Sequence, residues 1–240
     1  MTNLVGLCGS LRHASLNRKL LNEAIRLYRP DEYKEVDISL PLFDEDMEKT
    51  GIPVKVKEVA AVIEKADAII IASPEYNKGI SGVLKNALDW LSRTPGSIWK
   101  DKPIALVSAA AGRSGGETAQ FMTRACLTPF GPRLVTAPNV CLANAKDQFD
   151  ANGSLVSERY INTLKLLMEK LRREIGFSKT DIAIYSKTLG WITTVIFTLL
   201  GGLFVIRSGV LKAMFLAGIL TVSYTHLRAH ETEADLVCRL

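Results

Sequence analysis

The chain has 240 residues, and its 30 Lys and Arg against 25 Asp and Glu give a formal net charge of +5. Up to residue 178 there are 24 cationic against 21 anionic side chains, and beyond it 6 against 4. Neither part has the concentrated basic surface of a nucleic-acid-binding domain, so nucleic acid is not an expected partner. The length suits one α/β domain with a buried core, followed by an additional segment.

The spacing of the cysteines and the N-terminal sequence indicate in which cell compartment the protein is found. The four cysteines, Cys8, Cys126, Cys141 and Cys238, form no CxxC pair and have no spacing to histidine that would hold a metal. We interpret them as reduced, mostly buried thiols, and we expect no metal. The beginning MTNLVGLCGS lacks the basic region and long apolar stretch of a signal peptide. Both observations favour a cytoplasmic protein.

Five short runs rich in Val, Ile and Leu alternate with helical patterns, which predicts βαβ units around a mostly parallel sheet. The predicted strands are 4–8, 33–38, 68–72, 104–108 and 134–142. The last of these is the weakest prediction. Pro138 lies within it and has no N–H to donate to a neighbouring strand, so it should cap or bend the strand.

The segments between the strands have the periodicity of amphipathic helices. One apolar face is formed by Leu16, Leu20, Leu21, Ala24 and Leu27, and a second by Val56, Val59, Ala60 and Ile63. Further helices are predicted at 82–91, 116–127 and 157–175. Because crossovers between parallel strands are right-handed, helices should cover both faces of the sheet. The predicted fold is an α/β three-layer sandwich, doubly wound around a five-stranded parallel sheet.

The segment GSLRHASLNR, residues 9–18, lies where the first predicted strand gives way to the first helix. The beginning of a helix exposes unpaired N–H groups with a partial positive charge, which stabilise an anion. Ser10, Arg12, Ser15 and Asn17 add donors that suit a phosphate monoester. The alternative is that a serine only caps the helix and Arg12 is a surface charge. Glycine-rich nucleotide motifs, GxGxxG after this strand or GxxxxGK[ST] anywhere, are absent.

Two more loops follow predicted strands. SPEYNKGISGVLKNALDWL begins at residue 73, where Pro74 restricts the backbone, Tyr76 offers a flat amphipathic ring, and Gly79 and Gly82 should let the chain turn. SAAAGRSGG, residues 108–116, has small residues that permit close approach to a planar ring. Because all three loops follow parallel strands, they should meet at one edge of the sheet, where open α/β folds bind ligands.

These motifs, with PLFDEDME and GIP between them, resemble the NADPH-dependent FMN reductase family from about residue 4 to residue 173. The resemblance implies a flavodoxin-like fold, non-covalently bound FMN and a homodimer or homotetramer. It places around the FMN phosphate the residues Ser10, Arg12, Ser15, Leu16 and Asn17. It places along the flavin ring Pro74, Glu75, Tyr76 and Asn77, together with the loop that contains Ala110 and Gly112. Close relatives often have a hydroxyl residue at the position of Ala110, so a flavin contact there would come from the backbone.

The family resemblance also implies a reaction. We expect NADPH or NADH to reduce FMN, the nicotinamide to leave, and a quinone, flavin, azo compound or metal anion to enter the same shallow site. The flavin performs the chemistry, so no catalytic side chain is expected. His13 is interpreted as an exposed side chain, with acid catalysis as the alternative. Arg113 is interpreted as an exposed charge, with binding of the NADPH phosphates as the alternative. Glu75 is interpreted as structural, with a role as a base as the alternative. Two other functions remain open: an electron carrier without its own NADPH turnover, and a membrane-tethered regulator that has lost its ligand.

The apolar residues of segment 82–91 exceed what one helix face needs. Two interpretations have equal weight: the helix packs against a second subunit, or it is buried within its own subunit.

The composition changes after residue 177. Residues 188–206 contain no charge and nearly suffice to cross a bilayer, with basic residues ahead of them, and 213–223 form a second apolar piece. We divide the chain into a reductase domain 1–178, an apolar segment 179–222 and a tail 223–240. The apolar segment is a membrane anchor, an amphipathic or core element, or foreign sequence. The tail is similar to translated adapter read-through, and a metal site at His226 and His230 is not expected because a third ligand is lacking.

Overall fold

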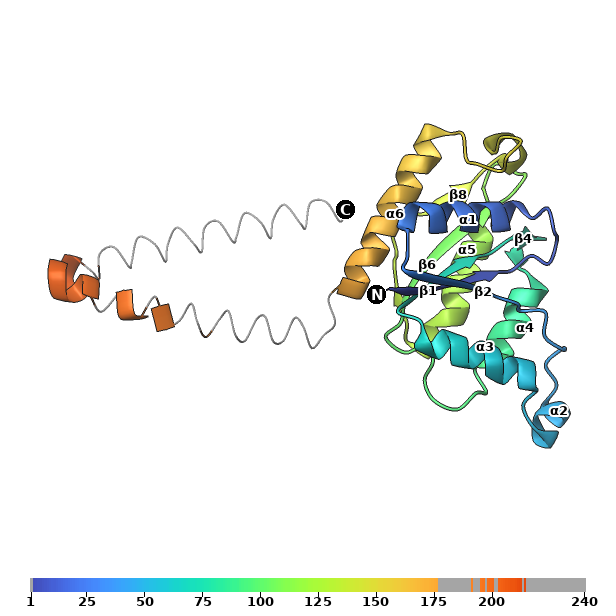
Figure 1. The fold of residues 1–240 in the computed structure, drawn as a ribbon, viewed down its shortest axis with the longest axis horizontal. Helices are drawn as coiled ribbons and strands as arrows, with labels where there is room; N and C mark the ends of the chain where they lie inside the picture. The colour runs from blue at the N-terminus through green and yellow to red at the C-terminus, as the bar shows by residue number, and fades with distance from the viewer. Residues whose placement is uncertain are drawn as a thin grey trace. The chain divides into compact units, whose positions relative to one another are not determined.

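A computed structural model describes residues 2–176 of the chain, together with 191, 195–196, 198–200, 203–212 and 214. The chain divides into two compact units, Met1–Phe177 and Ser178–Leu240. The first unit is a parallel sheet between two layers of helices (Figure 1). This arrangement confirms the predicted three-layer α/β sandwich.

The main sheet has the strand order β2-β1-β3-β6-β7, and β8 also pairs with β6. All of its pairings are parallel. This order is that of the flavodoxin-like doubly wound fold. The strands are β1 (Asn3–Cys8), β2 (Glu32–Val36), β3 (Ala68–Ala72), β6 (Pro103–Ala109), β7 (Arg133–Leu134) and β8 (Val140–Leu142).

The fifth position of the sheet differs from the single predicted strand 134–142. Two short strands occupy it: β7 pairs with the beginning of β6 at Pro103 and Ile104, and β8 pairs with its end from Val107 to Ala109. The residues between them include Pro138. Proline cannot donate a ladder hydrogen bond, which explains why the strand is interrupted there.

The two faces of the sheet are covered by different helices. Helices α1 (Leu16–Tyr28) and α6 (Glu158–Gly176) pack on one face, and α3 (Val54–Lys65), α4 (Gly82–Leu91) and α5 (Glu117–Leu127) on the other. The completely buried strand β3 shows the division: Ala68, Ile70 and Ala72 belong to the first core cluster, Ile69 and Ile71 to the second. This alternation follows from the two-residue period of a strand.

Several short elements were not expected from the sequence. They are α2 (Glu45–Thr50), the antiparallel pair β4 (Glu75–Tyr76) and β5 (Gly79–Ile80), and 3-10 turns at Thr128–Phe130 and Ala145–Gln148. Asn77 and Lys78 connect β4 to β5, with φ angles of 49° and 61°. Two consecutive left-handed residues form the tight turn that matches strand twist. The prediction that Gly79 and Gly82 provide the turn was therefore wrong.

Helix α4 is buried within its own subunit. Its apolar side chains Leu84, Ala87, Leu88, Trp90 and Leu91 are each at most 1% exposed. The Trp90 indole donates a 2.8 Å hydrogen bond from Nε1 to the Pro41 carbonyl and packs edge-on against Phe43, with ring centroids 5.0 Å apart. The segment around Pro41 thus covers the helix. Of the two interpretations of α4, the structure supports burial within one subunit.

In the second unit, the structure describes helical residues at 203–208 and 210–212. No helix among the residues described in either unit is long and apolar enough to cross a membrane. Residues 188–190, 192–194, 197 and 201–202 of the predicted span 188–206 lie outside the described residues. So do the second apolar piece 213–223, except for residue 214, and the tail 223–240 with Cys238, His226 and His230.

Candidate functional site

Three loops meet at the carboxyl edge of the sheet. The first loop (residues 9–15) follows β1, the second loop (73–81) follows β3, and the third loop (110–116) follows β6. These three strands are neighbours in the sheet and run parallel, as predicted. β1 is joined to β2 on one side and to β3 on the other, so the strand order reverses there. In open α/β sheets, ligands bind at such a switch point.

The first and second loops are held together by Gly9. Its N–H donates a 2.9 Å hydrogen bond to the Ala72 carbonyl, and its carbonyl accepts a 2.7 Å hydrogen bond from Ser81 Oγ. Ser81 also caps α4 by accepting from Leu84 N at 3.2 Å. A Cβ atom on Gly9 would lie only 2.8 Å from Pro74 Cδ. A glycine is needed because the two loops approach this closely.

The backbone of the first loop offers a row of hydrogen-bond donors. Within residues 2–176, neither backbone nor side chains accept a hydrogen bond from the N–H groups of residues 10–17. Their paired neighbours on either side are Gly9, which donates to Ala72, and Arg18, which donates to Ser15 Oγ at 3.3 Å. The row ends at the beginning of α1, where the helix adds a partial positive charge. It can therefore receive an anion with several oxygen atoms.

The carbonyl groups of the same loop are bound by Arg18, which the sequence analysis missed. Arg18 donates from one terminal nitrogen to the Arg12 carbonyl at 3.0 Å and from the other to the Ser10 carbonyl at 3.3 Å. Its Nε donates to Glu35 Oε1 on β2 at 2.8 Å. One signal was available in the sequence. A cation in the first turn of a helix opposes the helix dipole, which indicates that it has another partner.

The serines of the first loop are both buried, and Arg12 is exposed. Ser15 is the N-cap of α1, as the capping alternative proposed. Leu16 is half-buried at the first position of the helix. The structure thus brings the predicted phosphate residues together around one turn. Their backbone N–H groups are available, whereas the Ser15 hydroxyl already accepts from Arg18 N.

Asn17 has a different position from the one expected of a phosphate ligand. Its side chain is buried, and its amide makes two hydrogen bonds to the backbone of Ala109. Nδ2 donates to the carbonyl at 2.8 Å, and Oδ1 accepts from the N–H at 2.9 Å. These bonds join the beginning of α1 to the end of β6. The Asn17 side chain therefore fixes the position of the first loop relative to the third.

In the second loop, Glu75 holds the β4–β5 hairpin against α5. Its carboxylate accepts from Ala119 N at 3.3 Å and forms an ion pair with Lys78 Nζ at 3.2 Å. Desolvation raises the pKa of Glu75, but hydrogen bonds from Lys78 and from the first turn of α5 outweigh it and leave the pKa below its usual value. This supports the structural interpretation of Glu75. Pro74 is buried, while Tyr76, 51% exposed, and Asn77 remain accessible.

In the third loop, both backbone groups of Ala110 and the carbonyl of Gly112 are hydrogen-bonded to other backbone groups. Ala110 N donates to the Leu142 carbonyl at 3.1 Å, and the Ala110 carbonyl accepts from Ala145 N at 3.0 Å. The Gly112 carbonyl accepts from both Gly115 and Asn144, each at 3.3 Å. The N–H and carbonyl groups of Ala110, which were expected to make polar contacts to a flavin, are therefore already hydrogen-bonded within the protein. Ala110 and Gly112 can still contribute a small, close surface.

Comparison with known proteins agrees with this geometry. Residues 2–147 match the family model described as NADPH-dependent FMN reductase. An NAD(P)H-dependent FMN reductase of Pseudomonas aeruginosa is 38% identical over 178 residues, 70% of this chain and 96% of that protein. An NAD(P)H:quinone oxidoreductase of Solanum tuberosum is 40% identical over 178 residues, 70% of this chain and 90% of that protein.

A solved structure shows the same fold. FerB, a flavoenzyme NAD(P)H:(acceptor) oxidoreductase from Paracoccus denitrificans, superposes with a TM-score of 0.67 and 28% sequence identity, covering 73% of this chain and 98% of that one. The family match covers more than half of the chain, and the first relative is matched over nearly its whole length. The chain therefore belongs to the NADPH-dependent FMN reductase family.

Proposed function

We propose that this oxidoreductase binds FMN at the switch point between β1 and β3 and uses NAD(P)H to reduce quinones and similar small-molecule acceptors. The observation that carries the proposal is the row of unpaired N–H groups at residues 10–17, beside a second loop that presents Tyr76. The Solanum tuberosum relative is named as a quinone oxidoreductase, which supports the choice of acceptor. The matches described above offer no support for an electron carrier without its own NAD(P)H turnover.

The residues at this edge suit the two ends of FMN. The N–H groups of the first loop and the exposed Arg12 would hold the phosphate, because both donate to an anion. Pro74, Tyr76 and Asn77 would lie along the ring, since the Gly9 contact brings Pro74 next to the first loop. When bound, FMN supplies hydride transfer between NAD(P)H and the acceptor.

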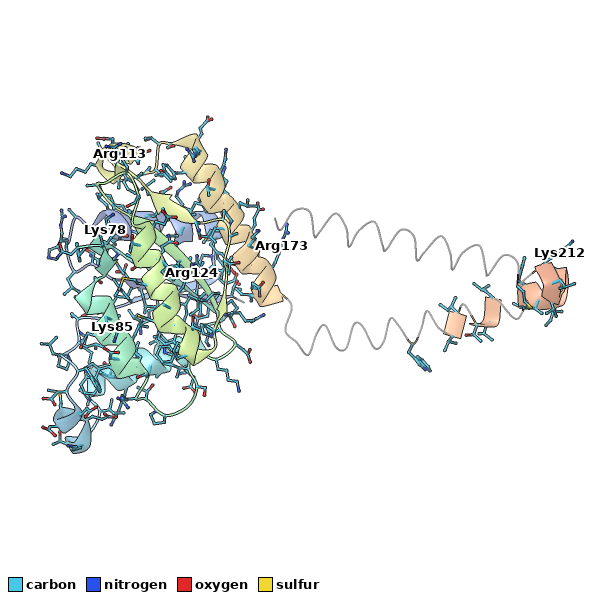
Figure 2. All side chains as sticks on the ribbon, turned by 180° about the vertical axis from the view of Figure 1, so that it is seen from behind. Lys78, Lys85, Arg113, Arg124, Arg173 and Lys212 are labelled. Carbon is cyan, nitrogen blue, oxygen red and sulfur yellow. The ribbon has the colours of Figure 1, made fainter. Side chains whose placement is uncertain are left out.

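The protein's own residues position this chemistry. Glu75 holds the hairpin through Ala119 and Lys78, so its carboxylate has a structural task. His13 is exposed on the first loop. Figure 2 shows the side chains of Lys78 and Arg113 at the same edge of the domain, with Arg173 at the opposite edge. We infer that Arg113, which is exposed on the third loop, meets a phosphate of the incoming dinucleotide.

The test is the flavin spectrum of the purified full-length protein. We expect a yellow protein whose visible absorbance is lost when NADPH is added without oxygen and returns when a quinone is added. A colour that persists with both NADPH and NADH would support the electron carrier instead. A colourless protein that cannot be reconstituted with FMN would contradict both functions.

We further propose that the enzyme is a homodimer or homotetramer. Phe121 and Met122, on α5, are 73% and 37% exposed, and a Cβ on Gly79 of the hairpin would lie 3.7 Å from Met122 Sδ. An apolar surface beside a ligand site is typical of a subunit interface. Light scattering of the wild type and of Phe121→Glu tests this, because a charge at the interface should shift the protein towards monomers. A wild-type monomer would contradict the proposal.

Location and domain organisation are also proposals. The thiols of Cys8, Cys126 and Cys141 are free in the structure, which supports a cytoplasmic reductase.

We propose that the reductase domain is 1–178 and that the apolar segment 179–222, through 188–206, attaches it to a membrane. Detergent should then be required to extract the full chain but not a chain that ends at residue 178. Equal extraction of both without detergent would contradict the attachment.

A further inference from the structure

Arg18 binds three groups, two in the loop that follows β1 and one on β2. Its guanidinium reaches the carbonyls of Ser10 and Arg12 at 3.3 and 3.0 Å and the carboxylate of Glu35 at 2.8 Å. We propose that Arg18, held by Glu35, is a positioning residue that orients the peptide groups of the first loop towards the FMN phosphate without touching it. This inference rests on the proposed function, which places the phosphate at this loop.

The geometry of the peptide bond gives the reason. In a trans peptide, the carbonyl of one residue and the N–H of the next lie in one plane and point in opposite directions. The only cis bond within residues 2–176 is Ala137–Pro138, so the loop peptides are trans. When Arg18 binds the carbonyls of Ser10 and Arg12, the N–H groups of Leu11 and His13 must point away from the guanidinium.

Those two N–H groups belong to the unpaired row at residues 10–17. Arg18 thus determines which side of the loop presents donors and which presents acceptors. Without Arg18, the Ser10 carbonyl would keep only a weak 3.6 Å hydrogen bond from Cys8 Sγ, and the Arg12 carbonyl would lose the donor that the structure describes for it. Either peptide could then rotate more easily and turn a carbonyl oxygen towards the ligand. A phosphate would then face a partial negative charge in place of a hydrogen-bond donor.

Glu35 determines where the guanidinium lies. It is on β2, whose register with β1 is set by five parallel residue pairs, including Gly6 with Glu35. The Arg18 and Glu35 side chains are 30% and 27% exposed, so solvent only partly weakens their interaction. The carboxylate also neutralises the charge of Arg18. This pairing does not suit a role in which Arg18 attracts phosphate by its charge, because Glu35 cancels that charge.

Two roles for Arg18 therefore make opposite predictions. If Arg18 acts as a positive charge, Arg18→Lys should preserve phosphate binding, and Glu35→Gln should strengthen it by removing a nearby negative charge. If Arg18 positions the loop, Arg18→Lys should fail, because one ammonium cannot reproduce the planar guanidinium that contacts three groups. Glu35→Gln should then weaken binding, because the guanidinium is held less firmly.

The experiment compares FMN with riboflavin, which has the same ring without the phosphate. Flavin-free full-length protein is titrated with each ligand, and the two dissociation constants are measured for the wild type, Arg18→Met, Arg18→Lys and Glu35→Gln. Arg26→Met is the matched control. Arg26 is also on α1 and also pairs with a carboxylate, Glu23 at 2.8 Å, but the hydrogen bonds from its side chain that the structure describes go only to that residue.

We expect both Arg18 variants to raise the FMN dissociation constant about tenfold to hundredfold, with riboflavin changed by less than about twofold. Glu35→Gln should raise it about threefold to tenfold, and should have no further effect in the Arg18→Met background, because Glu35 acts only through Arg18. Arg26→Met should bind both ligands as the wild type does.

The inference is overturned if Arg18→Lys binds FMN like the wild type, if Glu35→Gln binds it more tightly, or if the variants lose FMN and riboflavin equally. Circular dichroism and thermal unfolding of each flavin-free variant check the fold. If Arg18→Met does not fold, Glu35→Gln still decides between the two roles. A wild-type protein that binds no FMN would refute the proposed function itself, whereas wild-type binding with unaffected variants refutes only the role of Arg18.

Discussion

The first and third loops lie at the same edge of the sheet and were both expected to contact a flavin, but their backbones are used differently. In the first loop, Arg18 binds carbonyls, and the N–H groups of residues 10–17 are unpaired within residues 2–176. In the third loop, both polar backbone groups of Ala110 are hydrogen-bonded to the segment that follows β8 or to β8 itself. In the third loop the N–H groups of residues 111–114 and 116 also have no acceptor within residues 2–176, so the two loops differ in what holds them. A side chain binds carbonyls of the first loop, and backbone groups bind Ala110 in the third.

The difference shows what small residues indicate at a ligand-binding edge. Gly115 and Gly116 have positive φ angles, and a Cβ on Gly115 would lie 2.4 Å from the Cys141 carbonyl carbon. Gly115 is needed because it meets the backbone of Cys141, and Gly116 because it meets the Ser108 side chain, and both contacts are independent of any ligand. Small residues in a loop at this edge therefore do not by themselves identify a ligand contact.

The largest expected effect is on stability, from Gly115→Ala. The new methyl group would strike the backbone of Cys141, and φ of 62° disfavours any residue with a Cβ. We expect a loss of about 3 kcal/mol or more in the free energy of unfolding, measured with denaturant. Gly112→Ala is the control, because no atom lies within 4 Å of its Cβ position. Equal stability of the two variants would mean that the third loop is not tightly packed.

Much of the fold could be predicted from local patterns. The parallel sheet, the helical faces and the meeting of three loops follow from hydrophobic periodicity and from the rules of βαβ connections. The interruption of the fifth strand was also indicated by Pro138. These features depend on residues close together in the chain, so the sequence contains their signal.

The use of polar groups in the site could not be predicted in the same way. Asn17 has a side-chain amide that could donate to a phosphate, yet this amide binds the backbone of Ala109, 92 residues away. Arg18 binds Glu35 across two elements, and Asn77 with Lys78 replaces the expected glycine turn. The partners of Asn17 and Arg18 depend on which groups the tertiary structure brings near. The sequence signals only that Arg18 needs a partner and does not show which residue provides it.

Asn17→Ala tests whether the two compared loops are joined through this side chain. The variant removes both hydrogen bonds and leaves the Ala109 N–H and carbonyl buried without these partners. We expect a loss of about 2 to 3 kcal/mol in the free energy of unfolding. Asn22→Ala, at an exposed position of the same helix, should change it little. If Asn17→Ala is as stable as Asn22→Ala but loses FMN, the side chain is a ligand contact after all.

Arg12→Ala tests the binding side of the first loop. Arg12 is exposed, and we expect its guanidinium to add to the N–H groups around the phosphate. The variant should weaken FMN binding by about 1.5 to 3 kcal/mol and leave riboflavin binding unchanged, as measured by calorimetric titration. His13→Ala, at the next exposed position, is the control. An unchanged FMN affinity would identify Arg12 as a surface charge and leave phosphate binding to the backbone.

The smallest expected effect concerns Glu75, which joins the second loop to the helix that follows the third. The folded protein lowers the pKa of Glu75 below its usual 4.5, so the ionised carboxylate stabilises the fold above that pH, and this contribution is lost as the pH falls through the lowered pKa. Glu75→Gln should therefore be less stable than the wild type by about 1 kcal/mol at neutral pH. The difference should shrink as the pH falls below 4.5 and disappear below the lowered pKa of the folded protein, because the wild-type carboxylate is then protonated as well. Denaturant unfolding of both proteins across this range measures it. A difference that stays constant with pH would show that Glu75 holds the hairpin by packing alone, and that neither Lys78 nor the first turn of α5 gains from its charge.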